Sequence, residues 1–306
     1  MHEGSRKAII AAFFANLGIA IAKFAGFLIT ASAGLLAEAG HSLADTGNQA
    51  LLILGGKRAA RRSDQEHPFG YGRERYFWAF VVALVLFSMG GLFALYEGIE
   101  KVRHPHETEN LPVAIGILVF AILLETYSLR TAVREARHVK LPGTSWWQFI
   151  RGSKSPELPV VLLEDVGAEI GLFLALFGVL LAHFTEEPRW DAVGSIAIGV
   201  LLVLIAIVLA IEMKALLIGE SATADAEEAI VSAMTGSTNV ERLIHLKTQH
   251  LGPDELLVGA KLEFAHDLSL AELASAINGV EAATRKAVPS ARVIYIEPDI
   301  YVAPTS

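Results

Sequence analysis

The chain of 306 residues is 53% hydrophobic and 19% charged, and its mean hydropathy is +0.47. That hydropathy is high for a soluble protein and is typical of a polytopic membrane protein. The formal net charge is −8 without any basic stripe, which argues against a nucleic-acid partner, and the absence of cysteine excludes disulfides and thiolate metal sites.

Six segments are long and apolar enough to be membrane helices. A helix needs about 20 mostly apolar residues to cross about 30 Å of hydrocarbon. The first segment has no small-residue cleavage site, so we interpret it as a membrane helix rather than a removed signal peptide. The six predicted transmembrane helices span 8–30, 33–55, 76–99, 112–133, 158–183 and 192–216.

Basic residues set the orientation of these helices. One side of the membrane receives only Lys101, Arg103 and Arg189 from the long connections, so the positive-inside rule makes the other side, with both termini, cytoplasmic. A start that does not resemble a transit peptide, together with short loops, favours a prokaryotic inner membrane. The cytoplasmic basic residues are Arg6, Lys7, Lys57, Arg58, Arg61, Arg62, Arg73, Arg75, Arg130, Arg134, Arg137, Lys140, Arg151 and Lys154.

The last part of the chain is acidic and has a different pattern. From Gly219 onward there are 13 Asp and Glu against 6 Lys and Arg. We therefore divide the chain into a transmembrane domain, residues 1–217, and a cytoplasmic domain, residues 218–306. The order αββαβ predicts a small α+β sandwich with its helices on one face of the sheet. Its elements are a helix at 224–236, strands at 242–250 and 255–264, a helix at 269–287 and a strand at 291–297.

The second apolar segment carries a polar stripe. His41 and Asp45 are four residues apart and share a face, and Glu38 and Asn48 continue that face in both directions. Ionisable groups inside a membrane helix are costly and usually mark an ion or substrate route. Imidazole and carboxylate ligands suit Zn²⁺, Mn²⁺ or Fe²⁺. The alternative is a structural hydrogen-bond pair that joins two helices.

The fifth apolar segment supplies candidate partners for that stripe. Asp165 and Glu169 are four residues apart on one face, and Glu164 is rotated by about 100° from Asp165. Three carboxylates in an apolar run need a cation or protonation. Interfacial or protonated carboxylates are the alternative interpretation.

Other polar groups have two interpretations each. Glu125, inside the fourth segment, either relays protons or balances Lys23 of the first. Asp64 and His67, three residues apart in the second basic connection, form either a loop metal site or a solvated loop.

The ordered set of motifs resembles the cation diffusion facilitator family along essentially the whole chain. The motifs are "LLAEAGHSLADTGNQ", "DQEHPFGYGRERY", "LLIGES" and the αββαβ tail ending in "IYIEP". "HSLADTGNQ", "RERYFWAF" and "LLEDVGAEIG" are similar to the zinc transporter nine-like branch. The resemblance implies a homodimer of six-helix protomers in the lipid bilayer, each with a metallochaperone-like cytoplasmic domain. It also implies export of Zn²⁺ or a similar ion driven by proton entry, with no permanently bound cofactor.

The resemblance also implies which residues bind the ion. His41 and Asp45 match the family's ligand pair in the second helix, and Asp165 matches one ligand of the fifth. Val161 stands where the other fifth-helix ligand belongs, and Val cannot coordinate. Glu164, Asn48 or a water then completes the site, and Glu164 reaches it only if the helix is rotated or unwound. A site richer in hard oxygen leaves room for Mn²⁺ or Fe²⁺ beside Zn²⁺, with Co²⁺ and Cd²⁺ as further candidates.

The family's other metal sites look degraded in this sequence. Tyr71 replaces the second histidine of the loop site. We predict that the tail dimerises by packing and binds metal weakly or not at all, because His245 and His250 are off the family pattern and His266 is in a turn. The tail positions that align with the family's ligands are Ile244, Ala276, Tyr295 and Glu297, of which only the last can coordinate.

Two other functions compete with proton-coupled alternating access. An intramembrane metallohydrolase would use the same ligands with a metal-bound water, but the chain has no H-E-x-x-H motif. A non-transporting scaffold or metal-responsive regulator is favoured by the absent fifth-helix ligand and the degraded tail sites.

Overall fold

The computed structural model describes residues 3–30, 33–105 and 111–303, with side chains at all of these except 3–5, 27, 29, 30, 33–38, 40 and 41. The chain forms two compact units. The first unit comprises Met1–Arg58 and Glu74–Lys214, and the second comprises Ala59–Arg73 and Ala215–Ser306. The loop after the second long helix therefore groups with the C-terminal part of the chain.

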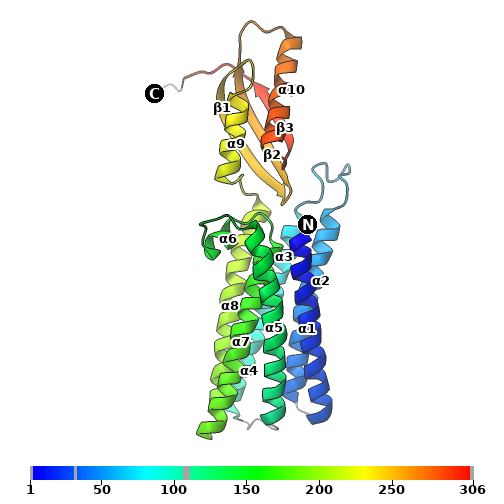
Figure 1. Ribbon diagram of the computed structural model, residues 1–306, viewed down its shortest axis with the longest axis vertical. Coiled ribbons are helices and arrows are strands. Elements are labelled where there is room, and N and C mark those ends of the chain that lie inside the picture. Colours follow the sequence, from blue (N-terminus) through cyan, green and yellow to red (C-terminus); the bar gives the residue numbers. More distant parts are fainter. Residues whose placement is uncertain (1–2, 31–32, 106–110, 304–306) are drawn as a thin grey trace. The chain divides into compact units, whose positions relative to one another are not determined.

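The first unit is a bundle of long helices that run side by side (Figure 1). The helix α5 packs against both α1 and α7. The helices α3 and α4 continue through a π-helical turn, η1, so that Glu74–Arg103 is one helical run. The bundle elements are α1 (Glu3–Thr30), α2 (Ala33–Ala59), α3 (Glu74–Val85), η1 (Leu86–Leu92), α4 (Phe93–Arg103), α5 (Leu111–Val139), α6 (Trp146–Gly152), α7 (Glu157–Thr185) and α8 (Arg189–Ile218).

Each of the six predicted membrane segments lies in a helix or helical run of this unit, so their helical structure is confirmed. Among the described residues, five stretches are long and apolar enough to cross a membrane, and α2 is not one of them. The polar groups of α2, including Asp45 and Asn48, lower its hydropathy. The protein is thus an integral, multi-pass membrane protein. The five stretches are Arg6–Gly26, Glu74–Arg103, Leu111–Val139, Glu157–Thr185 and Arg189–Ile218.

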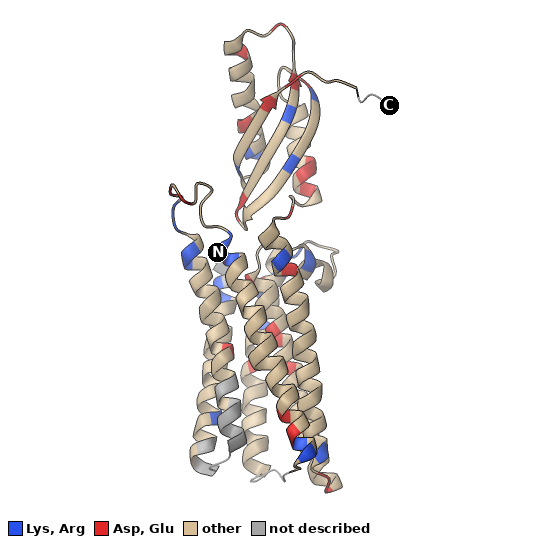
Figure 2. Cartoon of the chain, turned by 180° about the vertical axis from the view of Figure 1, so that it is seen from behind, with Lys and Arg blue, Asp and Glu red and all other residues tan. Residues whose placement is uncertain are grey.

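Charges have a clear distribution along the bundle. Lys and Arg gather mainly near the helix ends, whereas several Asp and Glu lie along the helices (Figure 2). At the start of α3 and α7, Arg75 makes a two-pronged ion pair with Glu157, with Nη2 at 2.8 Å from Oε2. Both side chains are buried, at 4% and 2% exposure. This pair joins the two helices at the end of the bundle where the predicted cytoplasmic loops lie.

The short helix α6 was not predicted. Its start is a capping box: Ser145 Oγ accepts the N–H of Gln148 at 3.1 Å, and Gln148 Oε1 accepts the N–H of Ser145 at 2.7 Å. The S-x-x-Q signal is therefore visible in the sequence. At seven residues, the helix is too short to show an apolar period.

The second unit confirms the predicted αββαβ order. The three-stranded sheet has the order β1–β2–β3, with β1 and β2 antiparallel and β2 and β3 parallel. Both helices cover one face of the sheet (Figures 1 and 2), and alternate β2 residues from Leu256 to Phe264 are buried against them. The elements are α9 (Ala224–Thr235), β1 (Val240–Gly252), β2 (Glu255–Phe264), α10 (Leu270–Ala287) and β3 (Ala291–Pro298).

Gly72 explains why the loop 59–73 belongs to this second unit. A Cβ atom at Gly72 would lie 2.7 Å from the carbonyl oxygen of Leu251, near the end of β1. Only a glycine allows the loop backbone to approach the strand so closely.

Candidate metal site

Three helices, α2, α5 and α7, carry polar side chains into the interior of the first unit. Asn48 and Gln49 of α2, Glu125 of α5, and Glu164 and Asp165 of α7 are each at most 4% exposed. Such groups are expensive inside a membrane protein and mark functional routes. The structure brings them together from segments that lie far apart in the sequence.

Glu164 is held by two carboxamides of α2. Asn48 donates its side-chain N–H to Oε1 at 2.9 Å, and Gln49 donates to Oε2 at 2.5 Å. The helix α7 is regular through this position. Glu164 therefore contacts α2 without the local unwinding that its angular position suggested.

The other two carboxylates of α7 are held by hydroxyl groups of α5. Ser128 donates to Asp165 Oδ2 at 2.8 Å, and Thr126 donates to Glu169 Oε1 at 2.8 Å. The lower-numbered donor pairs with the higher-numbered acceptor because the two helices run antiparallel. Glu169 thus lies one helical turn beyond Asp165 along the same interface.

The polar cluster is strongly acidic. Glu125 interacts electrostatically with Asp165, Asp45, Glu164 and Glu169, and these carboxylates supply its largest charge interactions. Asp45 is half-buried on α2 and interacts electrostatically with Glu164 and Asp165 of α7. Ionised carboxylates at such depth repel one another unless cations or protons neutralise them.

Four oxygen atoms of this cluster are buried without a hydrogen-bond donor among the described residues. They are Asn48 Oδ1, Gln49 Oε1, Asp165 Oδ1 and Glu169 Oε2. All four are acceptors, so a further hydrogen-bond acceptor cannot satisfy them. A cation is a suitable partner, since carbonyl and carboxylate oxygens are ligands for divalent ions. The residues present therefore fit a metal ion.

Two predicted groups of α2 cannot be placed in this cluster. His41 and Glu38 lie on the described backbone of α2, but their side chains lie outside the described part of the structure. On α7, Val161 is fully buried, one helical turn before Asp165. Lys23 of α1, weighed above as a balance for Glu125, is also buried.

The sequence interpretation gave no role to Gln49, Ser128 or Thr126. Each hydrogen-bonds a carboxylate of α7. A signal for the two hydroxyl residues is present in the sequence "ETYS", which groups Glu125, Thr126 and Ser128 within one turn of an apolar helix.

Asp64 and His67 lie in the loop of the second unit, at the surface. Asp64 Oδ1 accepts the backbone N–H of His67 at 2.8 Å, and Oδ2 accepts the Tyr71 hydroxyl at 2.5 Å. This hydroxyl is the main reason that the pKa of Asp64 lies below its usual value, and the same bond raises the pKa of Tyr71. Both carboxylate oxygens thus already have donors.

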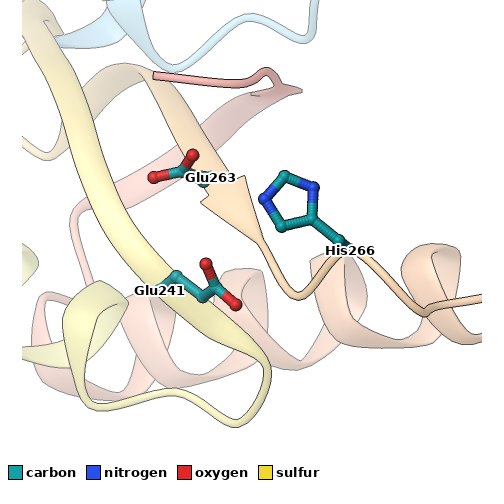
Figure 3. Close-up of side chains that lie close together, drawn as sticks. All are labelled: Glu241, Glu263 and His266. Carbon is teal, nitrogen blue, oxygen red and sulfur yellow. The ribbon is translucent and has the colours of Figure 1, made fainter. Parts of the chain in front are cut away.

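A second group with metal-ligand chemistry lies at the end of the sheet (Figure 3). Glu241, Glu263 and His266 each offer one ligand atom, and the three atoms lie within 4.8 Å of one another. Glu263 already accepts the backbone N–H of Tyr301 at 3.1 Å and lies 3.7 Å from Arg242 Nε. The Arg242 charge therefore competes with a metal ion for this carboxylate.

The aligned tail positions fit this picture. Tyr295 is exposed, and Glu297 pairs with Lys261 Nζ at 3.1 Å. The positive charge of Lys261, whose pKa is raised mainly by its hydrogen bond to Asp299, lies beside Glu297, the one aligned position able to coordinate.

The model of the cation efflux transmembrane domain matches residues 9–218. The chain belongs to the cation diffusion facilitator family. This match covers all of the helices that carry the acidic cluster, so the resemblance in the sequence motifs is confirmed.

Several family members are similar over most of this chain. The proton-coupled zinc antiporter SLC30A9, mitochondrial, of Xenopus laevis is 32% identical over 86% of the chain and 47% of its own length. The human protein of that name is 29% identical over 86% of the chain and 46% of its own length. A cadmium, cobalt and zinc/H⁺-K⁺ antiporter of Bacillus velezensis is 23% identical over 91% of the chain and 78% of its own length. The chain spans about half the length of the SLC30A9 relatives.

Proposed function

We propose that this protein exports divalent metal cations, with Zn²⁺ as the principal cargo, in exchange for protons. The relatives' names, proton-coupled zinc antiporter and cadmium, cobalt and zinc antiporter, support the choice of cargo and of counter-ion. Mn²⁺, Fe²⁺, Co²⁺ and Cd²⁺ are further candidates because the cluster is rich in oxygen ligands.

One observation carries the proposal: four buried acceptor oxygens lack donors within a cluster of carboxylates between α2, α5 and α7. A structural network would pair acceptors with donors. This network instead leaves oxygens available for a cation in the interior of a membrane bundle.

We assign the cargo ligands to His41 and Asp45 of α2 and Asp165 of α7. Asp45 supports this because it interacts with Asp165 across the two helices. Glu164 and Asn48 are assigned as further ligands, since one is a carboxylate and the other offers an unpaired oxygen. We place Glu38, Glu125 and Glu169 around this set, where they support the ligands or relay protons.

Transport requires that the site open alternately to each side. We propose that α2 is the sixth membrane span and that the bundle moves its helices around the acidic cluster. Metal affinity falls wherever protons occupy ligand lone pairs, so proton entry on the outer side releases the cargo. The surrounding apolar helices keep water out of the site. In such a low-dielectric place, metal affinity depends strongly on whether the ligands carry protons.

Assembly and location complete the proposal. We propose a homodimer in which residues 1–217 span the bilayer and residues 218–306 form a cytoplasmic domain. The distribution of Lys and Arg supports the placement of both termini in the cytoplasm. We propose that the protein lies in a bacterial cytoplasmic membrane, which is supported by bacterial relatives such as the Bacillus velezensis antiporter. Other relatives have "mitochondrial" in their names, so the location is tested by membrane fractionation of the source cells.

The competing functions predict different measurements. A metallohydrolase predicts hydrolysis that depends on the same ligands, and a scaffold predicts no metal flux at all. The relatives named as antiporters favour transport over both.

The test is metal flux in proteoliposomes that contain the full chain, with internal pH recorded. Asp45→Ala and Asp165→Ala should each abolish proton-linked Zn²⁺ flux. Glu187→Ala is the control because this acid is exposed, lies between α7 and α8 and pairs only with Arg189 at 3.8 Å among the described contacts. Flux like that of the unmodified protein in both site variants would eliminate this site.

A further inference from the structure

The clamp on Glu164 has features that a structural contact does not need. Asn48 and Gln49 are adjacent on α2, and each donates to a different oxygen of the same carboxylate. Asn48, Gln49 and Glu164 are 1%, 0% and 4% exposed. The two N–H donors hold both oxygens of the Glu164 side chain in place. The clamp therefore fixes the position of an acidic side chain inside the bundle.

The same two carboxamides also leave their own oxygens unpaired. Asn48 Oδ1 and Gln49 Oε1 are buried and lack a donor among the described residues. A polar atom left unpaired in the interior costs free energy, so a network that only joined two helices would avoid both losses. The two oxygens have the chemistry of a hard-cation ligand.

The place of Glu164 on its helix matters as well. Val161 precedes it by three residues, and Asp165 follows Val161 by four, so Val161 lies between the two acids on the helix surface. The Val161 side chain is aliphatic and fully buried. The face of α7 that carries Asp165 thus has no metal-ligating side chain at the position one turn before Asp165, while Glu164 offers its carboxyl group beside it.

We propose that Gln49 is a positioning residue which, together with the ligand Asn48, holds Glu164 as a cargo ligand in place of a ligand at Val161. This proposal rests on the proposed function, because it assigns ligands to the same transported ion. The added hard oxygens raise the affinity of the site for Mn²⁺ more than its affinity for Zn²⁺, because Zn²⁺ already binds well to the imidazole and carboxylate ligands. Glu164 thereby sets the metal preference of the site.

The experiment measures Zn²⁺ and Mn²⁺ transport in proteoliposomes and Zn²⁺ binding to the purified full chain by calorimetry. Glu164→Gln should raise KM for Zn²⁺ about 10- to 100-fold and raise it further for Mn²⁺. Asn48→Ala and Gln49→Ala should each raise KM about 10-fold with a smaller change in kcat. Thr46→Val is the matched control, because this buried hydroxyl of α2 donates within its own helix, to Ser42 O at 2.9 Å.

A rescue variant separates ligation from packing. Val161→Asp places a carboxylate one turn before Asp165 on the same helix. Combined with Glu164→Gln, it should restore most of the Zn²⁺ affinity that the single variant loses. A helix-joining role of Glu164 predicts no rescue, since the new carboxylate does not restore the clamp.

The outcomes divide clearly. Unchanged KM and an unchanged Zn²⁺ to Mn²⁺ ratio in Glu164→Gln overturn the inference, and so does a failed rescue in a folded double variant. If Glu164→Gln does not fold, Asn48→Ala and Gln49→Ala decide, and an unchanged metal ratio in both overturns it. Absence of metal flux from the unmodified protein is a different result, which removes the proposed function itself.

Discussion

Ser128 of α5 donates its hydroxyl to Asp165 Oδ2 on α7 at 2.8 Å, while Asp165 Oδ1 is buried without a donor in the described part of the chain. One oxygen of the carboxylate is therefore fixed and the other is available. This arrangement orients a ligand toward one side, as hydrogen bonds behind metal ligands commonly do.

The first prediction concerns that hydroxyl. Ser128→Ala removes the orienting bond, so KM for Zn²⁺ should rise about 10-fold, within the range seen when partners of metal ligands are lost. Ser88→Ala is the control because the Ser88 hydroxyl is exposed and donates to Leu84 O of its own helical run at 2.8 Å. Proteoliposome flux measures both, and equal KM values in the two folded variants would contradict the assignment.

The second prediction concerns the pair that joins α3 to α7. Glu157→Gln leaves the buried Arg75 guanidinium without its carboxylate, which should lower the free energy of unfolding by about 3–5 kcal/mol. Thermal unfolding of the purified protein measures the loss. Arg75→Lys should also destabilise, since an ammonium cannot replace the two-pronged contact.

The reversed pair provides the control for this prediction. Arg75→Glu combined with Glu157→Arg should recover part of the stability that either single reversal loses. If Glu157→Gln and the exposed Glu187→Gln melt at the same temperature, the pair contributes nothing to stability and the prediction is wrong.

The long helices could be predicted because a membrane requires long apolar runs, and the sheet because β2 alternates between buried and partly buried residues. Asp165 and Glu164 could be predicted as candidates because charge is rare in such runs. The hydrogen-bond partners of Glu164, Asn48 and Gln49, could not be predicted from the sequence. Helical spacing fixes the angle between Glu164 and Asp165, but the identity of the neighbouring helix follows from packing between segments 115 or more residues apart.

The group at the end of the sheet shows the same limit. Val240 pairs with Phe264 and Arg242 pairs with Glu263, so Glu241 is an extra residue in a β-bulge. A bulge changes the direction of a side chain, and strand alternation alone does not reveal it. The sequence predicted that His266 lies in a turn. Its closeness to Glu241 and Glu263 could not be predicted, because it depends on the bulge.

The third prediction concerns pH and the loop 59–73. The pKa of Asp64 is lowered mainly by the Tyr71 hydroxyl, so Tyr71→Phe should raise that pKa toward its usual value. Because the folded pKa is depressed, the stabilisation is present above the unfolded pKa of Asp64 and is lost as pH falls through the folded pKa. In the Phe variant this acid transition of the loop should therefore move to higher pH.

Carboxyl-labelled aspartate followed by NMR measures the titration in detergent, and Asp64→Asn identifies the signal. The Asp64 midpoint should increase in Tyr71→Phe and remain unchanged in Tyr96→Phe, which alters an exposed tyrosine of α4. An identical midpoint in all three proteins that retain Asp64 would show that the hydroxyl does not control the carboxylate.

The fourth prediction concerns metal in the tail. The Arg242 guanidinium lies over the Tyr301 ring at 4.3 Å and 3.7 Å from Glu263 Oε2, so it keeps a positive charge beside the only buried ligand of the group. Removal of metal by a chelator should therefore leave the proposed dimer intact, as measured by its mass in detergent. Dissociation on chelation would contradict this prediction.

Arg242→Ala makes the competition measurable. In a full chain whose membrane site is silenced by Asp45→Ala and Asp165→Ala, calorimetry should detect little Zn²⁺ binding. Arg242→Ala should add a Zn²⁺ site because Glu263 loses its positive neighbour, and His266→Ala should remove that site again because the imidazole is its nitrogen ligand. If the silenced chain with Arg242 intact already binds Zn²⁺ and loses it on His266→Ala alone, the arginine does not block the group and the tail is a metal site in its own right.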